Sequence, residues 1–529
     1  MKYCEAGRLV LNMKTSEMFH NAIAFQLFVK LTNKLKTNIA SRSDSVMGYS
    51  KSIIESRLLQ EFSALEMANF KSCAAKHYKN SKNKDNLNIG RIKSSCFIYS
   101  TITGELSITN SYLVKKIIRF IIHWHSIIFI YVRAIFTGSK LDKVFTLVYG
   151  IRVEDGLYLE FDDFCKYGSV SPLRESEHLI VESFTKTNFN YDDNTDYCNN
   201  PLHVLISKNK PSFLDFVSFL LLHLKCAILY FKSVANYPLM VILEEDFSYQ
   251  AIAISLNKEH LIKDIVITNS NMSRQLLWMS NLPNKKHTLH MVWYSQNAPF
   301  AFTYKADNIV SDEIGYRNIR VDETWVWTKY FANHLKNLGT PGIFHDIGSI
   351  LWYLRPKNVP PKNNNYINIM VFDVTPKKRE FLNLLGHSDF YIYNSFENMS
   401  KFILDIIKVS NALEKVVGVE FKVTLKNKRD RHEYDDPRYL DFLDNLVNNG
   451  ELILLEHTEN IYSLISQSDV VINYPYTSTA YIADYMNIPA IYYDPVQKLI
   501  PVYEESEGIM FSSGKDDLLS KLNNIFPSK

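Results

Sequence analysis

The residues with the clearest chemical potential in this sequence are three consecutive hydroxyl side chains, Thr477, Ser478 and Thr479. They follow the apolar run Val470–Asn473 and precede a segment with helical periodicity over residues 479–486. A helix N-terminus offers unpaired N–H groups and a partial positive charge, and hydroxyls add donors, so this turn suits a phosphate group. The alternative is an ordinary N-cap, which stabilises a helix by about 1 kcal/mol.

Polar side chains also follow the other short apolar runs of this region. The runs are Ile367–Phe372, Phe390–Tyr393, Glu420–Leu425, Leu452–Leu455, Val470–Asn473 and Ala490–Tyr493. Their alternation with helical periodicity predicts βα units and a parallel sheet, whose ligands bind at the carboxyl ends of the strands. We therefore expect one site built from Asp373, Thr375, Lys426, Lys428, His457, Thr477, Ser478, Thr479 and Asp494. Taken singly, each also fits a turn or a solvated edge.

Glycine is scarce, with 17 residues in a chain of 529, where average usage is roughly 7%. The sequence contains no G-x-G-x-x-G, no G-x-x-x-x-G-K-[ST] and no G-x-S-x-G. These absences exclude the dinucleotide fingerprint, the P-loop and the hydrolase nucleophile elbow. Any phosphate bound by this chain is therefore expected to meet hydroxyls, lysines and a helix terminus.

Charge is distributed unevenly along the chain. Residues 1–150 hold 22 Lys and Arg against 9 Asp and Glu, whereas the remaining residues hold 37 against 47. A basic end suggests an anionic partner, either nucleic acid or a membrane surface. Because no RRM, KH, zinc-finger or helix-turn-helix signature accompanies the charge, we expect no nucleic acid. The six cysteines lack C-x-x-C spacing, which favours a reducing, cytoplasmic setting, and the first 20 residues do not resemble a signal peptide.

Two apolar stretches bear on the membrane. Residues 112–136 are long enough to span a bilayer, but the cations within them make a helix in the interface more favourable than a span. A buried helix of the N-terminal region is the other interpretation. A basic cluster over residues 71–93 precedes this stretch. The second stretch, Phe213–Phe231, is expected to be a core helix.

The stretch Ser468–Pro495, together with the basic strand end TLKNKRDR before it, resembles the nucleotide-sugar half of GT-B glycosyltransferases. The resemblance is greatest to those that build bacterial surface polysaccharides such as capsule or O-antigen. It covers residues 366–515 and extends more faintly back to Glu244. It implies that the hydroxyl turn holds donor phosphate and that Lys426 and Lys428 neutralise it. A His-Pro pair often follows the basic strand in relatives, whereas Lys426 to Arg429 follow it here, so the donor class stays open.

A row of carboxylates, Glu244 to Asp246, follows the apolar run Leu239–Leu243, which we expect to be a buried strand. Inverting sugar transfer requires a carboxylate to accept the proton of the acceptor hydroxyl. Glu245 or Asp246 suits that catalytic role, although three acids at a strand end are also typical of a solvated turn. The acid pairs at 162–163 and 192–193 form no D-x-D motif, so we expect no obligatory metal.

Together these features predict an α/β fold with two Rossmann-like domains facing a cleft, a GT-B-like arrangement. We expect a basic, partly helical N-terminal region at 1–150, an acceptor-side domain at 151–360 and a nucleotide-sugar domain at 361–529, with a linker near Pro356 to Asn365. The predicted function is sugar transfer from a nucleotide-sugar substrate, without a further cofactor, to a surface polysaccharide or lipid-linked acceptor. The predicted location is cytoplasmic, peripheral at the inner membrane. A nucleotide-sugar epimerase, a polyol-phosphate transferase and a non-catalytic membrane-associated scaffold are the alternatives.

Overall fold

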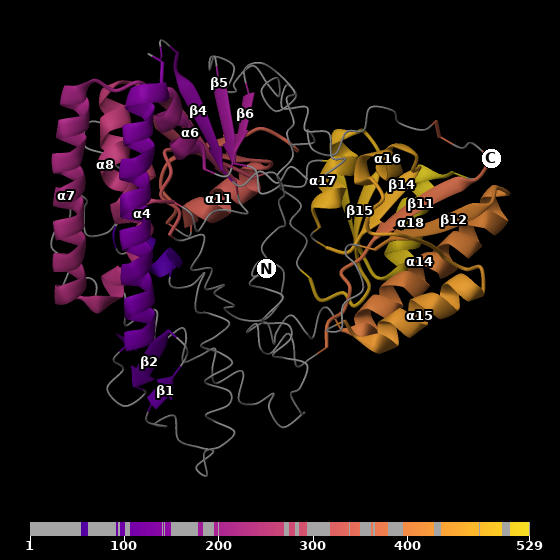
Figure 1. The fold of residues 1–529 in the computed structure, drawn as a ribbon. Coiled ribbons are helices and arrows are strands. Elements are labelled where there is room, and N and C mark those ends of the chain that lie inside the picture. Colours follow the sequence, from indigo (N-terminus) through magenta and orange to yellow (C-terminus); the bar gives the residue numbers. More distant parts are fainter. Residues whose placement is uncertain are drawn as a thin grey trace.

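The fold contains two parallel β-sheets, each flanked by helices, and a small antiparallel sheet at the N-terminal end of helix α4 (Asn110–Thr137) (Figure 1). It is seen in a computed structural model that describes residues 54, 56–61, 91–93, 96–100, 106–139, 141, 143–149, 178–182, 195–198, 200–268, 275–280, 285–293, 318–337, 339–349, 361–362, 365–378, 395–427, 435–475, 477–499 and 508–527. The small sheet consists of β1 (Arg91–Lys93), β2 (Phe97–Ser100) and β3 (Leu106–Ile108).

The first large sheet has the strand order β10-β9-β8-β7-β4-β5-β6, and every neighbouring pair is parallel. Its strands are β4 (Phe145–Tyr149), β5 (His178–Glu182), β6 (Thr195–Cys198), β7 (Ile262–Thr268), β8 (Thr288–Val292), β9 (Glu323–Val326) and β10 (Ile343–Asp346). The chain works outward from β4 in one direction and then from β7 in the other. The topological switch point, where such sheets bind ligands, therefore lies between β4 and β7.

The second sheet repeats this plan, with the order β13-β12-β11-β14-β15-β16 and parallel neighbours. Its strands are β11 (Ile367–Phe372), β12 (Phe421–Lys426), β13 (Ile453–Leu455), β14 (Val470–Asn473), β15 (Ala490–Asp494) and β16 (Ile509–Ser513). Its switch point lies between β11 and β14. Both orders are those of doubly wound sheets, so the prediction of an α/β fold with two Rossmann-like domains is confirmed.

Five of the six strands predicted for the second sheet are present, within one residue at each end. The sixth prediction, at residues 390–393, lies outside the described residues, and β16 was not predicted. The helices around this sheet are α14 (Phe396–Val417), α15 (Pro437–Asn448), α16 (Ile461–Ser466), α17 (Ser478–Tyr485) and α18 (Lys515–Ile525). Local signals define their ends, since Ser395 caps α14, Asp436 caps α15, and α14 stops at Gly418 with φ 73°.

The helices of the first domain pack mainly on one face of its sheet. They are α4 (Asn110–Thr137), α6 (Pro201–Lys208), α7 (Phe213–Asn236), α8 (Glu244–Lys258), α9 (Leu277–Ser280) and α11 (Lys329–Asn337), with the 3₁₀ helix η3 (Pro238–Leu243). Side chains from these α-helices share one core with Leu147, Ile265 and Leu289 of the strands. Continuous apolar runs such as Ile265–Ile267 are typical of parallel strands buried on both faces.

Three expectations for the first half are corrected by this arrangement. Residues 239–243 form η3 rather than a strand, because a short apolar run that is wholly buried suits either element. The boundary at residue 150 falls too late, since β4 is an interior strand of the first sheet, paired with β7 and β5. The stretch 213–231 is not a core helix, because Phe213 and Leu214 are 72% and 77% exposed. The basic residues 71–90 and most of the predicted linker lie outside the described residues.

The two domains share a core where their sheets approach each other. Val148, Val266, Val292 and Trp325, on four neighbouring strands of the first sheet, join the apolar cluster of the second domain. Just beyond β9, the ring of Trp327 lies edge to face against Tyr481 of α17, with centroids 6.4 Å apart. The carboxyl edge of the first sheet therefore contacts the helix that follows β14.

Candidate functional site

The switch point of the second sheet is lined by two buried polar residues on adjacent strands. Asp373 directly follows β11 and is 3% exposed, and Asn473 ends β14 and is fully buried. The strands stay paired at this point, because the Tyr474 N–H donates to the Phe372 carbonyl at 2.8 Å. Buried polar side chains at a switch point are where a doubly wound sheet places its ligand.

A small hydrogen-bond network supports the turn after β14. The Thr479 hydroxyl donates to Asn473 Oδ1 at 2.6 Å, and Thr477 Oγ1 lies 3.4 Å from the same oxygen and 3.2 Å from Thr479 Oγ1. Tyr492 of the next strand donates to the Thr477 carbonyl at 2.9 Å. Because a hydroxyl has one proton, Thr477 and Thr479 each donate that proton to a hydrogen bond within the network. Their geometry positions the turn and leaves no hydroxyl proton for a ligand.

The N-terminus of α17 is open as a result. Thr477 is its N-cap residue with φ −88° and ψ 148°, but the Thr477 side chain accepts no hydrogen bond from the first N–H groups of the helix. Ser478 is half-buried, and its hydroxyl makes no hydrogen bond within the described part of the chain. Asn473 Nδ2 is buried without a hydrogen-bond partner in the described part of the chain. An uncapped helix start with unused donors beside it is suited to an anion.

Of the two lysines predicted to neutralise the donor phosphate, Lys426 and Lys428, the structure describes Lys426. Lys426 ends β12 and is 4% exposed, and its Nζ donates to the carbonyls of His457 at 2.7 Å and Asn427 at 3.2 Å. Burial lowers the pKa of this lysine, and Glu459 partly opposes the effect. Lys428 lies outside the described residues. His457 contributes its backbone carbonyl, which orients Lys426 at the carboxyl edge of the sheet.

The remaining predicted residues of this edge are a mixed set. Asp373 accepts a hydrogen bond from the Tyr439 hydroxyl at 2.6 Å, and burial together with this carboxylate raises the pKa of Tyr439 far above its usual range. Thr375 is half-buried. Asp494 is fully buried and accepts from the N–H groups of Val496, Gln497 and Leu499 at 2.8–3.1 Å. These three bonds make Asp494 the organiser of the loop after β15 and leave it no direct path to a ligand.

The three carboxylates of the first domain form the first turn of α8, and their environments differ sharply. Asp246 is fully buried, accepts from Arg57 Nε at 3.0 Å and accepts from the Leu277 N–H at 2.7 Å. Glu244 is 1% exposed and pairs with Lys116 at 2.7 Å. Burial raises the pKa of Glu244 to about 7, although Lys116 and Arg119 act in the opposite direction. Both residues thus tie α8 to other helical segments.

Glu245 is the carboxylate that stays accessible. It is half-buried, and within the described residues no hydrogen bond or ion pair engages it. Its charge is among those that raise the pKa of the phenol of Tyr149, the last residue of β4, after burial, Glu182, Cys198 and Tyr249. Burial and Glu245 likewise raise the pKa of Tyr249. Helix α8 leads directly into β7, the strand paired with β4, so its first turn, which carries Glu245, lies at the carboxyl end of these strands, the switch-point edge of the first sheet.

The turn before α17 lies within a region of the chain that matches a known protein family. A family model described as "Polysaccharide biosynthesis PFTS motif protein" matches residues 223–522, more than half of the chain. The chain belongs to this family. Residues Pro475 to Ser478 read P-Y-T-S, which differs from P-F-T-S by one aromatic residue. The motif in the family's name thus coincides with the turn that opens α17.

Solved structures of low similarity accompany the PFTS match. They include a glycosyltransferase from Rickettsia africae, at 13% identity and TM-score 0.35, covering 73% of this chain and 89% of that one. The E. coli trehalose-6-phosphate structure bound with UDP-2-fluoro glucose has 10% identity and TM-score 0.38, covering 73% and 92%. The wall teichoic acid polymerase TagF has 11% identity and TM-score 0.34, covering 79% and 89%. TM-scores this low carry no conclusion, and no curated protein matches.

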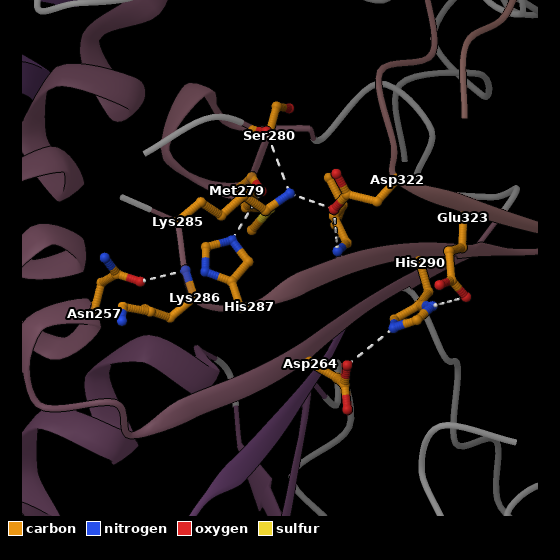
Figure 2. Close-up of polar contacts among 11 residues, drawn as sticks. Asn257, Asp264, Met279, Ser280, Lys285, Lys286, His287, His290, Asp322 and Glu323 are labelled. Carbon is orange, nitrogen blue, oxygen red and sulfur yellow. Dashed lines mark hydrogen bonds and ion pairs between the residues drawn. The ribbon is translucent and has the colours of Figure 1, made fainter. Parts of the chain in front are cut away.

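A buried polar row that was not predicted crosses the first sheet of this PFTS-motif chain. His290 Nε2 lies 3.0 Å from Asp264 Oδ1, and its Nδ1 lies 3.4 Å from Glu323 (Figure 2). Glu323 also contacts His345 Nε2 at 3.2 Å. Both nitrogens of His290 face carboxylates, so the ring joins strands and is closed to substrate. Polar residues inside apolar strands were the available signal. Nearby, Lys285 binds Asp322, which also accepts from the Leu289 N–H at 2.6 Å.

The described residues include no group of three or more His, Cys, Asp or Glu side chains arranged to hold a metal ion. The prediction that no metal is obligatory therefore stays a prediction, because this observation concerns part of the chain only.

Proposed function

We propose that this PFTS-motif protein is a glycosyltransferase that moves a sugar from a nucleotide-sugar donor to a polysaccharide or lipid-linked glycan acceptor. One observation carries the proposal: the uncapped N-terminus of α17 opens at the switch point of a doubly wound sheet, inside the motif that gives the family its name. An open helix start at that position is a phosphate site by its chemistry. In polysaccharide biosynthesis, a sugar attached to a nucleotide diphosphate or monophosphate is the substrate that presents such a phosphate.

On the donor side, the backbone N–H groups at the start of α17 and the Ser478 hydroxyl bind the donor phosphate. Asn473, Thr477 and Thr479 hold this turn in place through their shared hydrogen bonds. Lys426 lies at the same carboxyl edge and adds positive charge. As the sugar departs, negative charge grows on the phosphate, and fixed donors of this kind stabilise it without reorganising.

On the acceptor side, Glu245 accepts the proton of the attacking hydroxyl. It is half-buried and unpaired within the described residues, and it belongs to the first turn of α8, at the carboxyl end of β4 and β7. Asp246 is not assigned this role, because Arg57 and the Leu277 N–H occupy its carboxylate. The contact between Trp327 and Tyr481 brings the carboxyl edge of the first sheet to α17, which supports donor and acceptor meeting between the two domains.

The experiment is a donor screen of the full chain with UDP-, GDP-, CMP- and CDP-linked substrates, read by thermal stabilisation and then by turnover with a glycan acceptor. A nucleotide at 100 times its Kd stabilises the fold by about 2.7 kcal/mol. Two variants at one position sharpen the test. Ser478→Ala removes only the hydroxyl, and Ser478→Pro also removes an N–H of α17. Proline suits this first helical position, and Thr477 before it is already extended.

We expect Ser478→Ala to weaken donor binding modestly and Ser478→Pro to weaken it by about tenfold or more, with the thermal stability of the unliganded protein retained. If both variants fold and bind the donor as tightly as the wild type, the donor phosphate does not bind at the start of α17. Isomerisation of the donor without acceptor would identify an epimerase instead, and transfer of a polyol phosphate would identify that transferase. Failure of every nucleotide to stabilise the protein would favour the scaffold. Repeating turnover in EDTA tests metal independence.

A further inference from the structure

Helices α4 and α7 form one continuous outer layer of the first domain (Figure 1). They run in opposite directions and meet through stacked rings. Phe120 stacks on Tyr230 at a centroid distance of 4.0 Å, and Tyr131 stacks on Phe219 at 4.2 Å. Because these contacts occur near both ends of the overlap, the pair behaves as a single surface, which we call the α4–α7 face.

The α4–α7 face is strongly apolar on its outer side. Phe129 and Phe136 of α4 are 70% and 79% exposed, and Leu221 of α7 is 67% exposed. The other exposed apolar side chains of the pair are Val114, Ile118, Ile121, Ile122, Phe213, Leu214, Val217, Leu224, Ile228 and Phe231. Soluble monomers rarely expose a contiguous apolar patch of more than a few hundred Å², and a larger one marks an interaction site.

Cations border this apolar surface on both helices. Side chains on an α-helix step by about 100° per residue, which places the exposed apolar residues of each helix in one stripe and its exposed cations along one edge of that stripe. The cations are Lys115, Arg119 and Arg133 on α4, and Lys225 and Lys232 on α7. Asp215 is the acidic residue of α4 and α7, and its carboxylate is engaged with Ser212 in the capping box of α7. An apolar stripe edged by cations complements a surface that is apolar inside and anionic outside.

The inner sides of the two helices are committed to the protein. Ile127, Tyr131 and Phe219 belong to the core beneath the first sheet, and Lys116 of α4 is buried in its ion pair with Glu244 of α8. By length and composition both helices could cross a membrane, but their most apolar windows are 22% and 28% buried within the fold. Spanning would carry the attached core and its buried ion pair into the bilayer. Lying flat leaves these contacts intact and uses only the outer side.

We infer that the α4–α7 face docks in the plane of an anionic phospholipid bilayer. The apolar stripe enters the boundary between headgroups and acyl chains. The flanking lysines and arginines extend their charged ends to the lipid phosphates, while their alkyl stems stay with the apolar surface. The inference rests on exposure and charge alone and is independent of the enzymatic activity proposed above. It also gives a reason for the exposure of α7, which a core helix would not show.

The test is flotation of the purified full chain with phosphatidylcholine vesicles, with and without phosphatidylglycerol. We expect binding that increases with phosphatidylglycerol and decreases with salt. Combining Phe129→Glu, Leu214→Glu and Leu221→Glu should reduce the bound fraction by about tenfold or more, because each places a charge in the apolar stripe. A matched control combines Ile343→Glu with Val416→Glu, which lie elsewhere at 61% and 60% exposure and should leave binding unchanged. Circular dichroism of each variant confirms that it is folded.

A second set replaces Arg133, Lys225 and Lys232 by glutamine. This set should abolish the preference for phosphatidylglycerol while keeping the weaker binding to phosphatidylcholine. Vesicle binding that is indifferent to both sets in folded protein would overturn the inference. A second result would also overturn the inference: the wild type does not bind vesicles and sediments as a dimer without lipid, and the glutamate set converts that dimer to a monomer. In that case a second copy of the chain covers the α4–α7 face.

Discussion

The indole of Trp327 and the phenol ring of Tyr481 meet edge to face, at a centroid distance of 6.4 Å and an interplanar angle of 88°. Trp327 follows β9 of the first sheet, and Tyr481 lies in α17, directly behind the turn that carries the PFTS-type motif. The indole is itself held, because its Nε1 donates to the Trp293 carbonyl at 2.6 Å. This contact makes the position of the motif turn depend on the first domain.

A double-mutant cycle measures that dependence. Trp327→Leu, Tyr481→Leu and the double variant should show a coupling of about 0.5–1.5 kcal/mol in the free energy of unfolding, as expected for an edge-to-face aromatic pair. Urea unfolding followed by tryptophan fluorescence supplies the values. Strict additivity of the two single changes would show that the domains are not coupled through these rings.

Asn473 offers a sharper test of the motif turn. In Asn473→Asp the side-chain oxygen can still accept from Thr477 and Thr479, but the amide donor becomes a carboxylate oxygen. A negative charge beside the start of α17 opposes a phosphate there, so donor affinity should fall by about tenfold or more. Isothermal calorimetry with the nucleotide found by the donor screen measures the change. Asn460→Asp, at the N-cap of α16, is the control and should bind normally, since aspartate caps a helix as well as asparagine.

The second sheet could be predicted from sequence because its strands are buried on both faces. Runs such as Val470–Asn473 and Ile367–Phe372 are almost entirely apolar and alternate with clear helical periods, so their bounds match the structure. The first sheet could not be predicted in the same way. Asp264, His290 and Glu323 interrupt its strands, and their interactions with one another become visible only when the strands are adjacent.

At the candidate site, the predicted parallel sheet places Asp373, Lys426 and the hydroxyl turn at one edge, because β12, β11 and β14 are neighbouring strands. Side-chain direction was beyond the sequence. Thr477 and Thr479 face inward because Asn473 lies beneath them. The carboxylate of Asp246 is occupied by Arg57, which is 189 residues away in the chain. No local pattern reveals a contact between residues so far apart, so the sequence could not separate Glu245 from Asp246 as the candidate base, although Glu245 is half-buried and Asp246 is fully buried.

The two neighbouring acids of α8 should therefore separate catalysis from stability. Glu245→Gln should lower kcat by about 10²–10⁴-fold, the usual contribution of a general base, and leave the urea midpoint unchanged. Asp246→Asn should lower the free energy of unfolding by about 3–5 kcal/mol, because it takes the fully buried carboxylate away from the Arg57 guanidinium, whose other ion pair is with the more exposed Glu61. Full activity in Glu245→Gln would place the proton acceptor elsewhere.

Buried histidines should make the fold sensitive to mild acid, and His287 gives the clearest case. It is 4% exposed, and its Nε2 lies 2.9 Å from the Met279 carbonyl, to which it must donate. Burial, aided by Lys285, lowers the pKa of His287 to about 4, whereas an unfolded histidine titrates near about 6.5. Between these values the unfolded chain binds the proton more readily, so stability is complete above about pH 6.5 and is lost as the pH falls toward 4.

For this one group the slope is at most about 1.4 kcal/mol per pH unit. His287→Gln keeps a donor for the Met279 carbonyl but cannot take up the proton, so the free energy of unfolding should change less steeply between pH 6 and pH 4.5, within the window set by about 6.5 and about 4. Urea titrations at several pH values measure the slope. His260→Asn is the control, since this exposed histidine has φ 56°, which asparagine tolerates. An unchanged slope in His287→Gln would mean that another group, such as His203 or His223, whose pKa values burial also lowers to about 4, dominates the acid response.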